Sequence, residues 1–96
     1  MSPINKKKLK KLRQNLDKLD NSFITLIKKR TRLVNEVLKL KLYKKEIVDK
    51  KRIKVILSQI RKKSIKNNID PKITNRIWKN MIMSYIDYER RNFKKK

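Results

Sequence analysis

Apolar side chains recur alternately every three and every four positions over the first forty residues of this sequence. No glycine or proline interrupts the repeat. Its members are Leu9, Leu12, Leu16, Leu19, Phe23, Leu26, Leu33, Val37 and Leu40. This period is typical of a long amphipathic helix that packs against other helices. The spacing predicts a single helix that continues to about Tyr43.

Such a helix is too long to be covered by its own chain. About forty helical residues span about 60 Å, which is roughly twice the diameter of a compact domain of this size. The remaining residues suffice for two more helices. The uncovered apolar side chains are most simply covered by the same helix of a second copy, related by a two-fold axis. We therefore expect an all-α protein with three helices, one of them very long, that forms an intertwined homodimer.

Two further helices are predicted by their N-terminal residues. Asp49 suits the N-cap of a second helix, which carries apolar residues to about Lys66. Asp70 followed by Pro71 suits the cap and the first position of a third helix, which continues to about Asn92. The expected organisation is a basic leader, a single helical domain and a basic tail. Their boundaries are 1–8, 9–93 and 94–96.

The composition excludes several kinds of site. The chain contains no cysteine and no histidine, which excludes disulfides, thiol or imidazole catalysis and most transition-metal sites. Its eight acidic residues are scattered, so we do not expect a site for a hard metal cation either. No apolar run is long enough for a membrane span, and the basic start is not followed by the apolar segment of a signal peptide. We expect a cytoplasmic protein with no membrane contact.

The net charge of +23 is extreme for 96 residues. It would ordinarily indicate a partner such as nucleic acid or an anionic membrane, but a chain rich in lysine, isoleucine and asparagine also fits a coding bias. A basic helical module that binds nucleic acid would gather its cations on one outer face, whereas here they are spread over all three helices. We expect no nucleic acid. A purely structural coiled coil would explain the first helix but not the capped third helix with Trp78.

Several cations interrupt or adjoin the apolar repeat. Arg30 occupies the position between Leu26 and Leu33. Lys41 lies eleven positions further and so only about 20° around the same helix. Arg13 is about 100° away and some 25 Å along the axis, so it reaches that site only from a second copy. Taken singly, Arg13 and Lys41 could also be solvent-exposed surface residues. Arg30 could also pair with a carboxylate and so set the alignment of packed helices.

Charged residues at two other places also bear on a possible site, and those of the second helix support a bound anion. Lys50, Lys51 and Arg52 form the first turn of the second helix, where they oppose the helix dipole unless an anion lies close by. Glu89 ends the apolar stripe of the third helix and also fits an ion pair with Arg30. Together these residues describe a cationic pocket with one carboxyl group and no nucleophile. Such a pocket suits a small polyanion and a unimolecular rearrangement, promoted by fixed charge and by a held conformation.

At these residues the sequence resembles the all-α, AroQ-type chorismate mutases over nearly its whole length, from about Leu9 to Phe93. The resemblance is carried by Leu12-Arg13-Gln14-Asn15-Leu16-Asp17-Lys18-Leu19-Asp20, Leu26-Ile27-Lys28-Lys29-Arg30 with Val34 and Val37, Lys41, Asp49-Lys50-Lys51-Arg52, Ile69-Asp70-Pro71, and Ile77-Trp78 through Glu89. The combined spacing of its four cations is the most specific part. The resemblance implies an intertwined dimer of three-helix chains with two sites.

The resemblance also implies a reaction and residue roles. The reaction is the Claisen rearrangement of chorismate to prephenate, without a cofactor or a covalent intermediate. Arg30 and the Arg13 of a second copy bind the substrate's carboxylates. Arg52 assists near the ring, and Lys41 contacts the ether oxygen. Glu89 stands where the family has glutamine, or sometimes glutamate, as second donor to that oxygen. Because a carboxylate only accepts hydrogen bonds, that role requires a protonated Glu89.

Two positions differ from the usual mutase pattern. Ile53 stands where many mutases have a glutamate that contacts the ring hydroxyl, and Tyr85 stands where a small hydroxyl residue is common. Both resemble the related isochorismate-pyruvate lyases, which use the same cations to form salicylate and pyruvate. Asp49 is retained, and with Ile53 and Tyr85 it is expected to bind the substrate. Because Asp49 is retained and the mutase serves aromatic amino-acid biosynthesis, chorismate mutase is the predicted activity and the lyase is the alternative.

Overall fold

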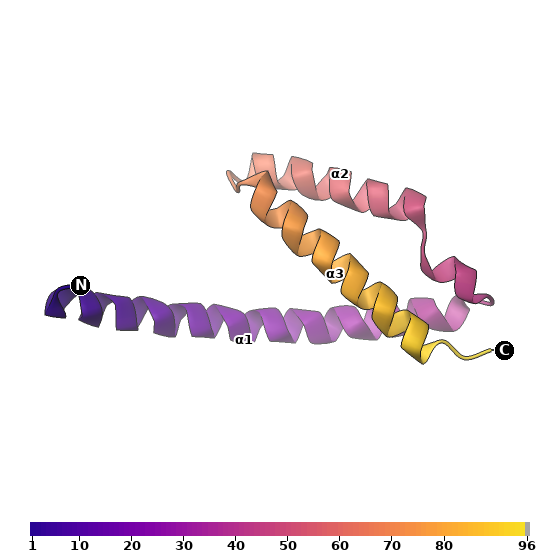
Figure 1. Cartoon of the computed structure of the whole chain (residues 1–96), viewed down its shortest axis with the longest axis horizontal. Helices are drawn as coiled ribbons and strands as arrows, with labels where there is room; N and C mark the ends of the chain where they lie inside the picture. Colours follow the sequence, from indigo (N-terminus) through magenta and orange to yellow (C-terminus); the bar gives the residue numbers. More distant parts are fainter. Residues whose placement is uncertain (96) are drawn as a thin grey trace. The chain divides into compact units, whose positions relative to one another are not determined.

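The computed structural model describes residues 1–95, and these contain three α-helices, one short 3-10 helix and no strand (Figure 1). The elements are α1 (Pro3–Leu40), η1 (Lys44–Ile47), α2 (Lys50–Lys66) and α3 (Pro71–Asn92). The predicted all-α class, with three helices of which one is very long, is confirmed. Lys96, the last residue of the predicted basic tail, lies outside the described residues. No helix within residues 1–95 is both long and apolar enough to cross a membrane.

α1 begins inside the segment predicted as a basic leader. The Ser2 hydroxyl accepts a hydrogen bond from the backbone N–H of Asn5 at 3.1 Å. The Ser2 carbonyl accepts one from the backbone N–H of Lys6 at 2.8 Å. Ser2 is therefore the N-cap, and Pro3 takes the first helical position, where a backbone N–H is not needed. The predicted leader is consequently helical from Pro3 onward.

α1 ends at Leu40, three residues before the predicted end at Tyr43. The Glu46 carboxylate accepts hydrogen bonds from the backbone N–H of Leu42 at 3.2 Å and of Tyr43 at 2.9 Å. Because these two amides bond to a side chain rather than to carbonyls of the preceding turn, the helix does not continue through them. The sequence had suggested that Lys41 lies on the first helix, but it lies just beyond the end of α1.

α2 and α3 pack against each other as a helical hairpin, and their caps are those predicted (Figure 1). Asp49 accepts a hydrogen bond from the backbone N–H of Arg52 at 2.9 Å. Asp70 accepts one from the backbone N–H of Lys72 at 2.9 Å. The connection between the helices contains Asn68 with φ of 57°, a left-handed conformation that asparagine tolerates better than most residues. Both helices end at the predicted residues.

Residues 34–96 form one compact unit with a small core. Its buried apolar side chains are Leu38 near the end of α1, Ile47 in η1 and Ile86 in α3. Partly buried side chains packed against them are Val48, Ile53, Ile82 and Phe93. Leu38 lies about one turn before Lys41, and Ile86 lies about one turn before Glu89. The core thereby places both charged residues.

Residues 1–33 form the other unit, which is the longer part of α1. None of its residues is buried, and the apolar repeat is exposed in the single chain. The exposed members are Leu12, Leu16, Leu19, Phe23, Leu26 and Leu33. Helices in proteins take most of their stability from packing of an apolar face. Within the described residues, the apolar face of this unit is not packed against another helix.

Candidate active site

The end of α1 and the end of α3 bring a lysine and a glutamate together. Lys41 Nζ donates a hydrogen bond to Glu89 Oε1 at 2.9 Å. Their side chains are only 16% and 9% exposed. Burial of a charge is unfavourable unless the charge is paired, and here each group supplies the counter-charge of the other. The structure thus joins two residues that the sequence had singled out separately.

Different local features place the two partners. Glu89 continues the apolar face of α3, where Ile86 is also buried. Lys41 follows the last turn of α1, and its backbone N–H donates to the Leu38 carbonyl at 3.1 Å. Leu38 and Ile86 belong to the same buried cluster. The two charged side chains therefore come from elements that the core holds together.

A second polar contact joins α1 directly to α3. The Tyr88 hydroxyl donates a hydrogen bond to Asn35 Oδ1 at 2.7 Å. The Tyr88 ring contacts the Tyr85 ring edge to face, with centroids 6.3 Å apart and an interplanar angle of 83°. Sequence reasoning missed both Asn35 and Tyr88. Tyr88 adjoins Glu89 in the chain but lies about 100° around the helix, and no periodicity pairs it with Asn35.

A hollow of about 590 Å³ lies beside Lys41 at the start of α2. It is lined by Lys41, Glu46, Val48, Asp49, Lys50 and Lys51. Both carboxylates in this lining accept hydrogen bonds from backbone N–H groups. The Lys41 ammonium group is already paired with Glu89, so the ammonium groups of Lys50 and Lys51 balance the two carboxylates of the lining. The first-turn lysines were singled out from the sequence, whereas Glu46 and Val48 were not predicted to line a site.

The remaining predicted residues of α2 and α3 differ in their surroundings. Arg52 is exposed in the first turn of α2 and is not among the residues that line the hollow. Ile53 is half-buried and packs against the core. Tyr85 is half-buried beside Tyr88. The structure therefore brings Asp49 into the hollow of Lys41, and it places Arg52 and Ile53 outside that lining.

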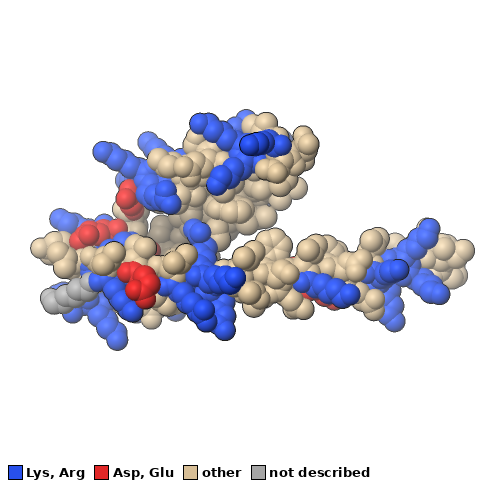
Figure 2. All heavy atoms as spheres, turned by 180° about the vertical axis from the view of Figure 1, so that it is seen from behind, with Lys and Arg blue, Asp and Glu red and all other residues tan. Residues whose placement is uncertain are grey.

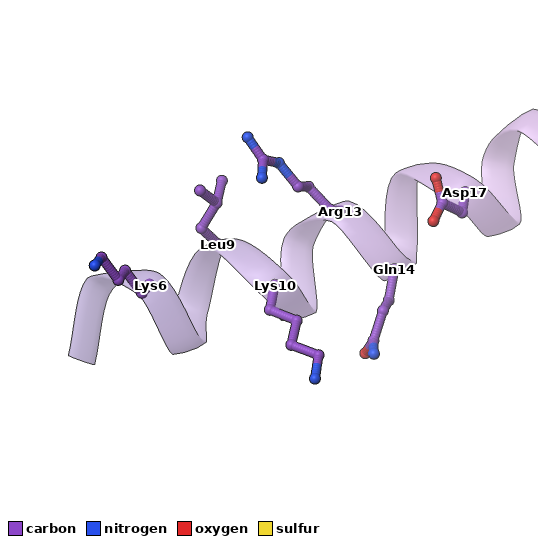
Figure 3. A pocket seen from close by; sticks show the side chains of 6 residues that line it. All are labelled: Lys6, Leu9, Lys10, Arg13, Gln14 and Asp17. Atoms are coloured by element: carbon purple, nitrogen blue, oxygen red, sulfur yellow. The ribbon is translucent and has the colours of Figure 1, made fainter. Parts of the chain in front are cut away.

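The two arginines predicted to bind carboxylates lie on residues 1–33. Arg13 is exposed on α1. It lines a hollow of about 350 Å³ together with Lys6, Leu9, Lys10, Gln14 and Asp17. Figure 3 shows Arg13 and Leu9 pointing to one side of the helix and Gln14 to the other. Because one helix supplies the whole lining, the hollow is open. Arg30 is half-buried further along α1.

Residues 12–90 match the family model for chorismate mutase type II. The chain belongs to the chorismate mutase type II family. Comparisons with curated proteins and with solved structures found no match. The matched segment contains every predicted site residue, from Arg13 to Glu89. The resemblance stated from those residues is therefore confirmed.

A type II chorismate mutase is an isomerase of aromatic amino-acid biosynthesis, and the charged residues of this one suit such a reaction. Cations can bind an anionic substrate, and donors at low exposure can stabilise charge that develops during a rearrangement. Among residues 1–95 of this chorismate mutase, no group of three or more His, Cys, Asp or Glu side chains is placed to hold a metal ion. Lys41, which contacts Glu89, is a donor of this kind, because its side chain is only 16% exposed.

Proposed function

We propose that this type II chorismate mutase converts chorismate to prephenate with Lys41 and Glu89 at the ether oxygen of the substrate. One observation carries the proposal. The two residues expected at that oxygen come from distant parts of the matched segment, yet they lie 2.9 Å apart with little exposure. Their meeting supports a shared site that the core of residues 34–96 holds in place.

The chemistry explains why donors at this oxygen matter. The rearrangement breaks a carbon–oxygen bond while a carbon–carbon bond forms within the same molecule. Electron density shifts toward the ether oxygen as its bond breaks, so a donor at that oxygen binds the transition state more strongly than the substrate. The ammonium group of Lys41 is such a donor. Its low exposure strengthens the interaction because little water screens it.

Glu89 is a second donor only when it carries a proton. An ionised carboxylate accepts hydrogen bonds, and in this structure Glu89 accepts from Lys41. Entry of the substrate offers Lys41 a new acceptor, and Glu89 donates to the same oxygen only after it has taken up a proton from solvent. The donor role therefore requires a protonated Glu89 in the active complex.

Arginines bind the two carboxylates of the substrate in this proposal. Arg30 of one chain and Arg13 of a second copy take these roles, and Arg52 assists near the ring. A guanidinium group forms two parallel hydrogen bonds with a carboxylate, which fixes the orientation of the substrate as well as its charge. Holding the substrate in the folded conformation that reacts then lowers the barrier of a unimolecular step.

The exposed apolar repeat of α1 supports the homodimer that this site needs. Phe23, the largest member of the repeat, is 60% exposed in the single chain. Contact with the same helix of a second copy would remove a long row of apolar side chains from water. The hollow beside Arg13 is lined from one helix only, and a second copy would close it. Assembly and completion of the site therefore go together.

The isochorismate-pyruvate lyase is the second candidate, and Ile53 and Tyr85 favour it. The Ile53 side chain packs against the core and has no hydrogen-bonding group. It cannot supply the contact to the ring hydroxyl that a glutamate makes in many mutases. Tyr85 presents an aromatic ring next to Tyr88 where a small hydroxyl residue is common. The same cations would serve an elimination that forms salicylate and pyruvate.

The distribution of charge favours a small anion over nucleic acid. On the face shown in Figure 2, Lys and Arg atoms are interspersed with uncharged residues on α1 and on the helical hairpin alike. A surface for duplex nucleic acid gathers its cations along the path of the phosphates, and its affinity falls steeply with salt. A titration of duplex binding against salt concentration tests this alternative, and we expect weak binding at physiological salt.

Turnover of the two substrates, measured separately, tests the proposal. Purified protein is incubated with chorismate or with isochorismate, and the formation of prephenate or salicylate is followed. We expect prephenate from chorismate, with kcat/KM well above that for isochorismate. Salicylate formation as the main activity would establish the lyase, and turnover of neither substrate would contradict both readings.

A further inference from the structure

The Asn35–Tyr88 hydrogen bond joins α1 to α3, and the Lys41–Glu89 pair joins the residue that follows α1 to α3, but the proposed reaction uses only the second contact. We propose that Asn35 and Tyr88 are positioning residues, which hold α3 against the end of α1 while Lys41 and Glu89 engage the substrate. This inference rests on the proposed function of Lys41 and Glu89. In this role the Asn35–Tyr88 bond keeps α3 in place against the end of α1 while Lys41 and Glu89 bind the substrate.

The end of α1 meets α3 through residues spaced three apart. Asn35 and Leu38 lie about 60° apart on the last turns of α1, and Lys41 follows directly after the helix end. Asn35 bonds to Tyr88 and Lys41 bonds to Glu89. Between them, Leu38 belongs to the apolar cluster of α3. Two polar contacts therefore flank an apolar one.

The apolar contact alone is a weak restraint on the crossing of these helices. The buried apolar core consists of three side chains, and no side chain among the described residues is completely buried. Within a single chain, therefore, few packed side chains oppose rotation of α3 against the end of α1. The two flanking polar contacts therefore carry an unusual share of the restraint.

One of those two contacts competes with the substrate in the proposed reaction. Lys41 and Glu89 both engage the ether oxygen when the substrate binds, so the bond between them becomes a weaker link between the two segments. The Asn35–Tyr88 bond has no assigned role toward the substrate and stays in place. Tyr88 also contacts Tyr85 through its ring. Loss of the bond would therefore displace Glu89 and Tyr85 together at the moment when their placement matters.

Kinetics of matched variants test the inference. Tyr88→Phe and Asn35→Leu each remove the bond at nearly constant size, and we expect a roughly tenfold lower kcat with KM changed by less than about twofold. The double variant should equal the single variants, because all three lose the same bond. Asn35→Asp keeps an acceptor oxygen and should rescue kcat. Tyr43→Phe, which removes the hydroxyl of an exposed tyrosine, is the control. Unchanged kcat in both single variants overturns the inference.

Thermal stability separates positioning from a purely structural role. Asn35→Leu leaves the partly buried Tyr88 hydroxyl without this acceptor, so it should lower Tm more than the double variant, in which that hydroxyl is absent. A positioning role predicts that the double variant regains Tm but not kcat. Recovery of kcat together with Tm would show that the bond acts only through stability.

Hydrogen exchange tests the same inference without turnover. Lys41→Met/Glu89→Leu removes the ion pair without leaving a buried charge unpaired. The amides of α3 from Tyr85 to Asn92 should stay protected in this background and should exchange about tenfold faster when Tyr88→Phe is added. Addition of Tyr43→Phe to the same background is the matched control. Equal protection with and without Tyr88→Phe overturns the inference even in an active enzyme. If the exchange result holds while the natural protein turns over neither substrate, the proposed function fails and the positioning role stands.

Discussion

The ammonium group of Lys41 lies 2.9 Å from the carboxylate of Glu89, although 48 positions of the chain separate the two residues. The ion pair of Lys39 with Glu36 has another origin, because it joins neighbours on one helix that are 71% and 70% exposed. Only the first pair depends on how the helices cross. It therefore connects the stability of the fold with the geometry of the site, and it can be tested through either.

Replacement of Lys41 by methionine should destabilise the fold. The change leaves the Glu89 carboxylate buried without this cation, which costs about 3 kcal/mol when a buried pair is broken. Lys41→Met/Glu89→Leu removes both charges and should recover most of the loss. The free energy of unfolding in urea is the measurement. Lys39→Met breaks an exposed pair and should change it by less than about 1 kcal/mol. Equal losses in Lys41→Met and Lys39→Met would contradict this prediction.

Replacement of Arg30 by alanine should abolish turnover while leaving the protein folded. The guanidinium is assigned to a substrate carboxylate, so its removal should lower kcat/KM by at least about a hundredfold. Circular dichroism and sedimentation should be unchanged. Arg32→Ala, an exposed neighbour on α1, is the control and should keep its activity. Near-normal turnover by Arg30→Ala would show that the assignment is wrong.

The rate should depend on pH through Glu89. If Glu89 donates a hydrogen bond in the active complex, kcat falls as pH rises, because only the protonated carboxyl group donates. Glu89→Gln donates at every pH and should remove this dependence. The measurement is the pH profile of kcat for both proteins. A flat profile of the natural protein from about pH 5 to 9 would remove Glu89 from the donor role.

Mixing of two inactive variants should restore activity if Arg13 acts across the dimer. A mixed dimer of Arg13→Ala and Arg30→Ala chains has one site with both arginines and one site with neither. Refolding an equal mixture makes about half of the dimers mixed, so about a quarter of the natural activity should return. Each variant refolded alone is the control. No recovery, in mixtures shown by sedimentation to be dimeric, would place both arginines in one chain.

Much of the local structure follows from the sequence. The caps at Asp49 and Asp70 were predicted correctly because an N-cap depends on side chains and amides within a few positions. The end of α1 was predicted at Tyr43 and was wrong by three residues. There the Glu46 side chain accepts hydrogen bonds from two backbone amides that would otherwise bond to helical carbonyls. The spacing of apolar residues carries no information about this contact.

The sequence by itself determined the helical class, the helix starts at α2 and α3, and the ionisable residues that stand among apolar neighbours. Only the tertiary structure decided that Lys41 meets Glu89 and that Tyr88 meets Asn35. Periodicity determines which face of its own helix a residue occupies, whereas contacts across 48 or 53 positions depend on the angle and register at which two helices cross. In this chain that crossing is set by a few buried side chains and two polar contacts, and no local pattern encodes it.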